Sequence, residues 1–234
     1  MNCDLNFMKI VLSKRLKAIA NLVEGNVIAD IGCDSANLAI WLAKSKGFYI
    51  YACDLREGPL KKARFNVEKF EVMHMIKLIQ ANGLQGVPSS VNEIIIAGLG
   101  GELIEKIILN CSWLKNKQIR IILQPQSFAV KLKQRLYKNG FFISRQVYVA
   151  DRGKAYEVFV ARFCGIKRVL SLKDALVGGL SKNDEGSCCW VGLKKQKLLK
   201  VLNSLIFAKQ TVEVLQKRLG LITQYSILKE WEVG

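Results

Sequence analysis

The feature that most constrains the fold is an alternation of short apolar runs with segments of helical periodicity. Each run is five or six residues long and mostly apolar without strict alternation, which is typical of parallel strands buried on both faces. The runs are Val27–Ile31, Tyr49–Cys53, Met75–Gln80, Glu93–Ala97 and Ile119–Leu123, and the helical segments between them are Ala36–Lys46, Pro59–Phe70 and Glu102–Asn110. This alternation predicts an α/β fold with a doubly wound, Rossmann-like sheet.

Further elements are expected before and after these strands. A helix is expected over Phe7–Val23, with Ser13 as a possible N-cap, and another over Ser127–Asn139. Two β-rich runs then follow, Phe141–Ala150 and Ala155–Phe163, joined by four turn-forming residues. Such a pair predicts a hairpin, so the sheet should contain an antiparallel strand near its end.

Beyond Gly165 the pattern becomes helical, and a coiled-coil stripe emerges. We therefore expect residues 1–164 to form a Rossmann-like domain and residues 165–234 a C-terminal helical, coiled-coil hairpin domain. Gly178-Gly179 and Lys182–Ser187 are expected to form a hinge-like stretch before the helix. The apolar positions alternate by three and four: Leu198, Val201, Leu205, Ala208, Val212, Leu215, Leu219 and Ile222. This stripe needs the preceding helix, the main domain or a second subunit as its partner. We expect a monomer in preference to a homodimer.

The charge of the chain favours a polyanionic partner. Lys and Arg number 36 against 19 Asp and Glu, which gives a net charge of +17. A field of this size favours polyanionic partners such as RNA, and a generally basic proteome is the less favoured alternative.

The cysteines and apolar runs indicate a cytoplasmic protein with no metal and no membrane partner. Seven cysteines occur without a Cys-x-x-Cys pair, and His74 is the single histidine, so free thiols in a reducing compartment are expected. No secretory signal is evident. The longest apolar run, Ile94–Ile108, is broken by glycines and charges, which excludes a membrane span.

The turn after the first apolar run carries the strongest chemical signal. Asp30, Gly32, Cys33 and Asp34 lie where a parallel strand ends, and ligands of such sheets bind at this edge. A dinucleotide site needs several glycines beside its pyrophosphate, whereas this turn has one glycine and two carboxylates. Carboxylates suit a ligand with an amino group and a sulfonium, which favours S-adenosylmethionine.

The next two strand ends continue this cofactor site. Asp54, followed by Leu55, ends the second run and can accept hydrogen bonds from both ribose hydroxyls. The simpler alternative is a helix cap. Asn82 and Gly83 follow the third run, where Asn82 can meet the adenine edge or can simply form an Asn-Gly turn.

The fourth strand ends in a cluster of glycines. Ala97 is followed by Gly98, Leu99, Gly100 and Gly101, and three glycines in four residues exceed what a tight turn requires. Close approach by a substrate or cofactor is the favoured interpretation.

Together these motifs resemble the bacterial tRNA (adenine-22-N1)-methyltransferases over about residues 12–163. The matching segments are Asp30-Ile-Gly-x-Asp34, Asp54-Leu-Arg-Glu-Gly-Pro-Leu-Lys-Lys-Ala63, Ile96-Ala-Gly-Leu-Gly-Gly101, Leu123-Gln-Pro125 and Gly153-Lys-Ala-Tyr-Glu157. The resemblance implies a class I S-adenosylmethionine-dependent enzyme that methylates N1 of an adenosine in the D-arm region of tRNA. It implies a coiled-coil C-terminal domain as well.

The resemblance also distributes roles among the motif residues. It implies cofactor roles for Asp30, Gly32, Asp34 and Asp54 and a pocket-lining role for Ala97–Gly101. Together with the positions at the strand ends, the expected cofactor residues are Asp30, Gly32, Cys33, Asp34, Asp54, Leu55, Asn82, Gly83, Ala97 and Gly98, and the catalytic candidates are Asp34, Gly98 and Gly100. Three positions depart from the family pattern: Ser35 replaces a histidine, Asn82 an aspartate and Ala39 a proline. The expected cost of Asn82 is weaker cofactor binding.

The chemistry requires positioning more than proton transfer, because adenine N1 carries its own lone pair. Asp34 and the carbonyls of Ala97–Gly98 are candidates to stabilise charge that develops on the base. Tyr156 or Phe128 can stack on the base, with core packing as the alternative. Lys14, Arg15 and the basic residues of the C-terminal helices are expected at phosphates, which makes binding salt-dependent.

Two other functions remain open at this point. One is methylation of another RNA or of a small molecule. The other is RNA binding without catalysis, which Ser35 and Asn82 keep in view.

Overall fold

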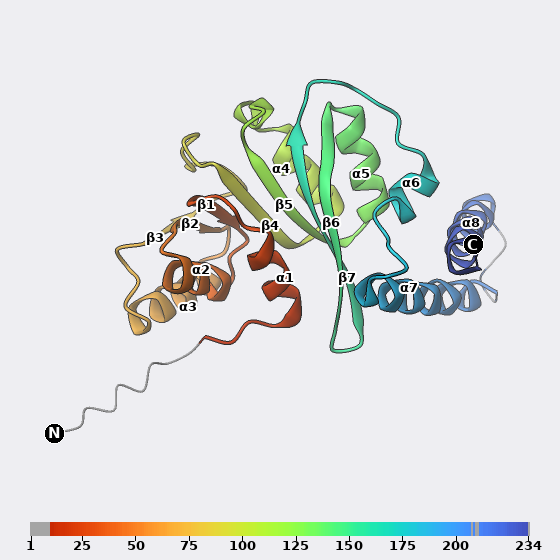
Figure 1. Ribbon diagram of the computed structural model, residues 1–234, viewed down its shortest axis with the longest axis horizontal. Helices are drawn as coiled ribbons and strands as arrows, with labels where there is room; N and C mark the ends of the chain where they lie inside the picture. The colour runs from red at the N-terminus through yellow and green to blue at the C-terminus, as the bar shows by residue number, and fades with distance from the viewer. Residues whose placement is uncertain (1–9, 207, 209–210, 234) are drawn as a thin grey trace.

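The computed structural model describes residues 10–206, 208 and 211–233, and a single sheet forms its centre (Figure 1). The seven strands of this sheet lie in the order β3-β2-β1-β4-β5-β7-β6. Their bounds are β1 Val27–Ile31, β2 Tyr49–Asp54, β3 Ile76–Gln80, β4 Glu93–Gly100, β5 Arg120–Ser127, β6 Phe141–Asp151 and β7 Lys154–Phe163. Strands β1 to β5 are parallel, and β7 pairs antiparallel with both β5 and β6. The predicted doubly wound sheet with an antiparallel strand near its end is confirmed.

Helices cover both faces of this sheet. One core cluster packs helices α1 (Lys14–Leu22), α2 (Asn37–Lys46) and α3 (Glu57–Lys69) against one face. A second cluster packs α4 (Gly101–Leu109) and α5 (Ala129–Lys138) against the other. The 3-10 helix η1 (Ser112–Lys115) precedes β5. The turns at the carboxyl ends of the parallel strands therefore rest on a core that is packed on both faces of the sheet.

Two strands run further than their apolar runs predict. Strand β4 continues through its glycines to Gly100, with irregular register around Leu99, and β5 continues past Pro125 to Ser127. Pairing of β5 with β7 stops at Leu123, so the missing N–H of Pro125 interrupts no ladder on that side. The paired strands carry the glycine-rich segment to the edge of the sheet as an ordered extension.

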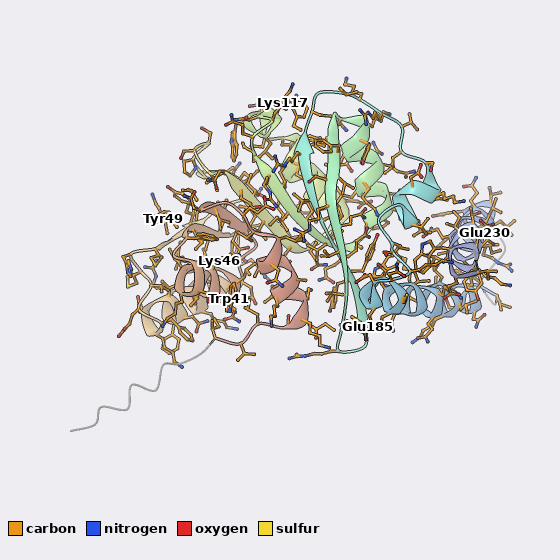
Figure 2. All side chains as sticks on the ribbon, viewed as in Figure 1. Trp41, Lys46, Tyr49, Lys117, Glu185 and Glu230 are labelled. Carbon is orange, nitrogen blue, oxygen red and sulfur yellow. The ribbon has the colours of Figure 1, made fainter. Side chains whose placement is uncertain are left out.

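Helix α1 is fixed to the rest of the domain at both ends. Ser13 accepts a hydrogen bond from Leu16 N at 3.3 Å, which confirms the predicted cap, while residues 7–9 of the predicted helix lie outside the described residues. At the other end, Arg120 Nη2 donates to Leu22 O at 2.8 Å, and Lys46 Nζ, labelled in Figure 2, donates to Val23 O at 3.2 Å. These contacts fix the orientation of α1 against the sheet, and with it the position of the helix's first turn.

The C-terminal region is helical, as predicted, but its apolar stripe is not continuous. Helix α7 (Glu185–Ser204) packs on β6 and β7, helix α6 (Leu172–Val177) packs on α5, and helix α8 (Val212–Val233) packs on α6 and α7 (Figure 1). The stripe from Leu198 to Ile222 spans the end of α7 and the start of α8, so the expectation of one uninterrupted seam is wrong. Leu228 of α8 packs instead with Leu198 and Trp190 of α7.

The predicted hinge-like stretch is also shorter than expected. Helix α7 already begins at Glu185, because the carboxylate of Asp184 accepts from Ser187 N at 2.7 Å and caps the helix. Every helix in the described part of the chain is too short or too polar to traverse a lipid bilayer.

Candidate functional site

The loop between β1 and α2 has an unusual backbone. Gly32, Asp34 and Ala36 all adopt left-handed conformations, with φ of 76°, 50° and 59°. For residues other than glycine this conformation is strained, and such strain concentrates at ligand sites. The N–H groups of Gly32 and Cys33 both donate to Cys53 O, at 2.8 and 2.9 Å. The turn is thereby held against the end of β2.

Asp30 is a buried carboxylate at the end of β1. It is 4% exposed, and no hydrogen bond to its side chain is found among the described residues. Burial raises the pKa of Asp30 to about 7, the positive charge of Arg15 opposes that rise, and the charge of Asp54 adds to it. A buried carboxylate in this state is stabilised by a cationic ligand. A cofactor with an ammonium and a sulfonium therefore fits this turn.

Asp54 lies against the same turn from the end of β2. Its carboxylate accepts from Asp34 N at 3.3 Å and from Arg56 N at 3.0 Å, and it is 6% exposed. Asp54 thus holds the turn together, and the oxygens of its carboxylate can accept further bonds from a ribose. Leu55, which follows it, is exposed.

The turn after β3 is the most open part of the predicted cofactor site. Asn82 is exposed, and its carbonyl accepts from Gln85 N at 3.4 Å in a turn. Gly83 has φ of 63° and lies against Ile107 of α4. Asn82 and Gly83 are therefore assigned to the predicted cofactor site only by their position at the end of β3.

The two cysteines of the site are packing groups. Cys33 and Cys53 are buried. Burial raises the pKa of the Cys53 thiol to about 12, and burial beside Asp30 raises the pKa of Cys33 further. Both thiols therefore stay protonated and unreactive.

The glycines at the end of β4 leave no room for side chains at one position. A Cβ on Gly101 would lie 2.7 Å from Ser127 O and 3.1 Å from Phe128 O, which are backbone atoms. Gly98 has φ of 81°, and a Cβ there would face the guanidinium of Arg15 at 3.8 Å. The close approach of the Ser127 and Phe128 backbone explains why residue 101 is glycine. At residue 98, glycine leaves space beside the Arg15 guanidinium at the end of β4.

Replacement of Gly101 by Ala should lower stability by about 1–3 kcal/mol, because backbone atoms cannot move aside as a flexible side chain can. Gly192→Ala is the matched control: nothing lies within 4 Å of its added Cβ in helix α7, so it should stabilise the protein slightly. Thermal unfolding of the two variants measures the difference. Equal melting temperatures would show that β4 and β5 separate at little cost.

Arg15 lies at this edge of the sheet, a position that the sequence did not indicate. Its Nη1 donates to Gln124 Oε1 at 2.7 Å, and its guanidinium lies 5.7 Å from the ring centroid of Tyr156. Its backbone N–H donates to Asp151 Oδ2 at 3.2 Å. Helix α1, β5 and the β6–β7 hairpin therefore converge beside Gly98, which no sequence spacing reveals.

Two other predicted residues lie near this edge. Phe128 is half exposed and has a left-handed backbone with φ of 55°, directly after β5. Ser35 lies in the strained loop, where its carbonyl accepts from Asn66 Nδ2 at 2.9 Å. The Ser35 position is thus braced by α3 through its backbone.

Comparison with known proteins identifies the relatives of this chain. A family model described as a methyltransferase domain matches residues 12–159. The chain is 31% identical over 221 residues to the tRNA (adenine(22)-N(1))-methyltransferase of Bacillus subtilis (strain 168), covering 93% of this chain and 87% of that protein.

Solved structures agree with this result. The crystal structure of the B. subtilis m1A22 tRNA methyltransferase TrmK superposes with a TM-score of 0.77 at 28% identity, over 95% of this chain and 99% of that one. A Streptococcus pneumoniae protein in complex with S-adenosyl-L-methionine gives a TM-score of 0.76 at 31% identity, over 94% and 99% of the two chains.

Proposed function

Because the chain belongs to the methyltransferase family that includes the tRNA (adenine(22)-N(1))-methyltransferase of B. subtilis, we propose that it is a tRNA methyltransferase itself. Its cofactor is S-adenosylmethionine, and its target is N1 of an adenosine in the D-arm region, position 22 in the relative. The observation that carries the proposal is the buried Asp30, without a hydrogen-bonding partner among the described residues, beside the strained Gly32–Ala36 turn.

Each predicted site residue takes a role in this proposal. Asp30 balances the cofactor's positive charge, Gly32 and Cys33 present backbone, and Asp54 with Leu55 lies at the ribose. Asn82 and Gly83 lie at the adenine. Asp34, Ala97, Gly98 and Gly100 border the pocket in which the methyl group is passed.

The protein's task in the reaction is to position two partners. S-adenosylmethionine supplies an electrophilic methyl group on sulfur when it is bound. Adenine N1 attacks with its own lone pair, so no residue has to remove a proton from it and no metal ion is needed as a Lewis acid. Holding the two reactants in line contributes up to about 7–11 kcal/mol in well-oriented cases. The carboxylate of Asp34 and the carbonyls of Ala97 and Gly98 stabilise the positive charge that forms on the base.

The proposal extends to the organisation of the whole chain. Residues 1–164 form the catalytic domain and residues 165–234 a helical domain of the coiled-coil hairpin type, which together act as a monomer on tRNA in the cytoplasm. The buried pair between Leu198 and Leu228 supports a hairpin within one chain. The charge of +17 supports a tRNA partner.

Methylation of an unmodified tRNA transcript with labelled cofactor tests the proposed function. We expect one methyl group per tRNA, mapped to N1 of the D-arm adenosine, and loss of the product when that adenosine is replaced by guanosine. Labelling of a cytidine or guanosine would contradict the adenine assignment. Cofactor binding without any transfer would favour the non-catalytic alternative.

A further inference from the structure

The environment of Arg15 indicates that its guanidinium binds a ligand other than the cofactor. Two side chains hold its guanidinium: Gln124, which is fully buried, accepts from Nη1, and the ring of Tyr156 packs against it. Asp151 in addition accepts from the backbone N–H of Arg15. The guanidinium has five N–H donors in one plane, and Gln124 takes one of them. A side chain held in this way is pre-organised to meet a planar ligand.

Arg15 lies beside the glycine-rich end of β4, which the proposed function assigns to methyl transfer. Its Nη1 lies 3.8 Å from the position of a Cβ on Gly98, at the end of β4. Its charge reaches Asp30, whose pKa it lowers against the effect of burial. Arg15, which is half-buried, therefore lies at the sheet edge to which the proposed function assigns both the cofactor and the substrate base.

The charges near Arg15 disfavour a phosphate as its ligand. The buried Asp30 interacts electrostatically with Arg15 and with the buried Asp54, so a phosphate placed against Arg15 would be repelled by these carboxylates. An uncharged base has no such penalty. The phosphates belong instead to the exposed cations at the rim, Lys14 on the first turn of α1 and Arg152 and Lys154 at the hairpin tip.

We propose that Arg15 binds the acceptor base itself, stacking its guanidinium on the adenine that receives the methyl group, with Tyr156 behind it. RNA bases splayed out of a fold commonly stack on arginine planes and aromatic rings. This inference rests on the proposed function and adds the residue that orients its substrate. It corrects the expectation that Arg15 contacts phosphate.

The first test separates the rate of methyl transfer from tRNA affinity. At pH 8.5, Arg15→Ala should slow single-turnover methylation at saturating tRNA about 100-fold, while the dependence of tRNA affinity on salt keeps its slope. Lys17→Ala removes the same charge from an exposed position of α1 and should leave the rate unchanged. The triple variant of Lys14, Arg152 and Lys154 should instead flatten the salt slope, by about 0.9 per lost phosphate contact.

Two controls show whether a slower rate reflects misfolding or loss of the guanidinium plane. Calorimetric binding of S-adenosylmethionine and the melting temperature report whether Arg15→Ala is folded. Arg15→Lys keeps the charge beside Asp30 but lacks the plane, so it should remain at least about 10-fold slow. Full activity of Arg15→Lys would overturn the stacking role, because charge alone would then suffice.

The second test needs no catalysis and so distinguishes this inference from the proposed function. A tRNA with an abasic residue at the acceptor position should bind wild-type protein roughly tenfold more weakly than intact tRNA. For Arg15→Ala the same change should cost less than about twofold, since the contact is already lost. Equal losses in both proteins would show that Arg15 does not touch the base. Failure of the wild-type protein to methylate any tRNA would instead overturn the proposed function.

Discussion

Asp30→Asn should weaken S-adenosylmethionine binding about 100-fold at pH 8.5, since a buried charge pair that loses one member typically costs about 2–5 kcal/mol. The side chain keeps its shape and loses only its charge. Isothermal titration calorimetry of the variant beside wild-type protein measures the effect. Asp34→Asn changes an exposed carboxylate in the same loop and should have a much smaller effect on affinity.

The pH dependence of cofactor binding gives this prediction a second signature. The pKa of Asp30 is raised to about 7, so the free protein carries this group protonated below pH 7. The cationic ligand requires the ionised form, and affinity should therefore fall about tenfold for each pH unit below 7 and stay level above it. Asp30→Asn should abolish this slope. A slope that persisted in the variant would assign the titration to another group.

The fold should tolerate the same substitution. A carboxyl group whose pKa is raised by folding binds protons more tightly in the folded state, so stability that is present at low pH declines as pH rises from about 4 to about 7. Asn escapes this decline, and at pH 8.5 the variant should melt no lower than wild type. Loss of binding with unchanged or increased melting temperature separates a functional carboxylate from a structural one.

Glu157→Gln should cost about 3–5 kcal/mol of stability, the largest effect expected of a single substitution outside the cofactor site. The Glu157 carboxylate accepts from Lys133 Nζ at 2.5 Å and from Gln146 Nε2 at 2.7 Å, and both charged groups are buried. Burial lowers the pKa of Lys194 on α7, and the charge of Glu157 opposes that shift. Removal of this carboxylate therefore leaves buried lysine charge without its counter-ion.

Urea unfolding followed by tryptophan fluorescence measures this loss, because Trp190 packs on Tyr148 with 5.0 Å between ring centroids, in the cluster that joins α7 to β6. Glu232→Gln is the matched control. It breaks the more exposed ion pair with Lys195 and should cost less than about 1 kcal/mol. A double replacement, Lys133→Met with Glu157→Leu, should be more stable than Glu157→Gln; equal stability would mean that the pair itself is not the source of the loss.

The sheet could be predicted from the sequence because its strands are buried on both faces. A run such as Glu93–Ala97 is read correctly where apolar side chains are packed, and its end is missed where glycines continue the pairing to Gly100. Burial pattern is visible in a sequence, whereas backbone pairing between Leu99 and Pro125 is not.

The C-terminal region shows a different limit. The heptad pattern continues from Leu198 through Leu205 to Val212, and no glycine or proline marks the turn after Ser204. Periodicity alone therefore cannot show that the chain reverses there. The contacts of Leu228, which lies outside the predicted stripe, decide the packing instead.

The common edge of the proposed cofactor residues was predictable, and the position of Arg15 at that edge was not. Asp30, Asp54 and the glycines stand at strand ends, so their common edge follows from topology alone. Arg15 reaches that edge from a helix before the first strand and meets Tyr156 from the last one. The sequence alone does not distinguish a charged helix residue that faces solvent from one that faces a pocket.

The reversal of β7 has a consequence for how such enzymes can diversify. Because this strand runs against β5, the turn at Arg152–Gly153 emerges on the ligand side of the sheet (Figure 1). Insertions at this tip would leave every strand register and the cofactor turn unchanged. Changes at the hairpin tip could therefore alter which nucleic acid is bound without changing the residues proposed for cofactor binding and methyl transfer.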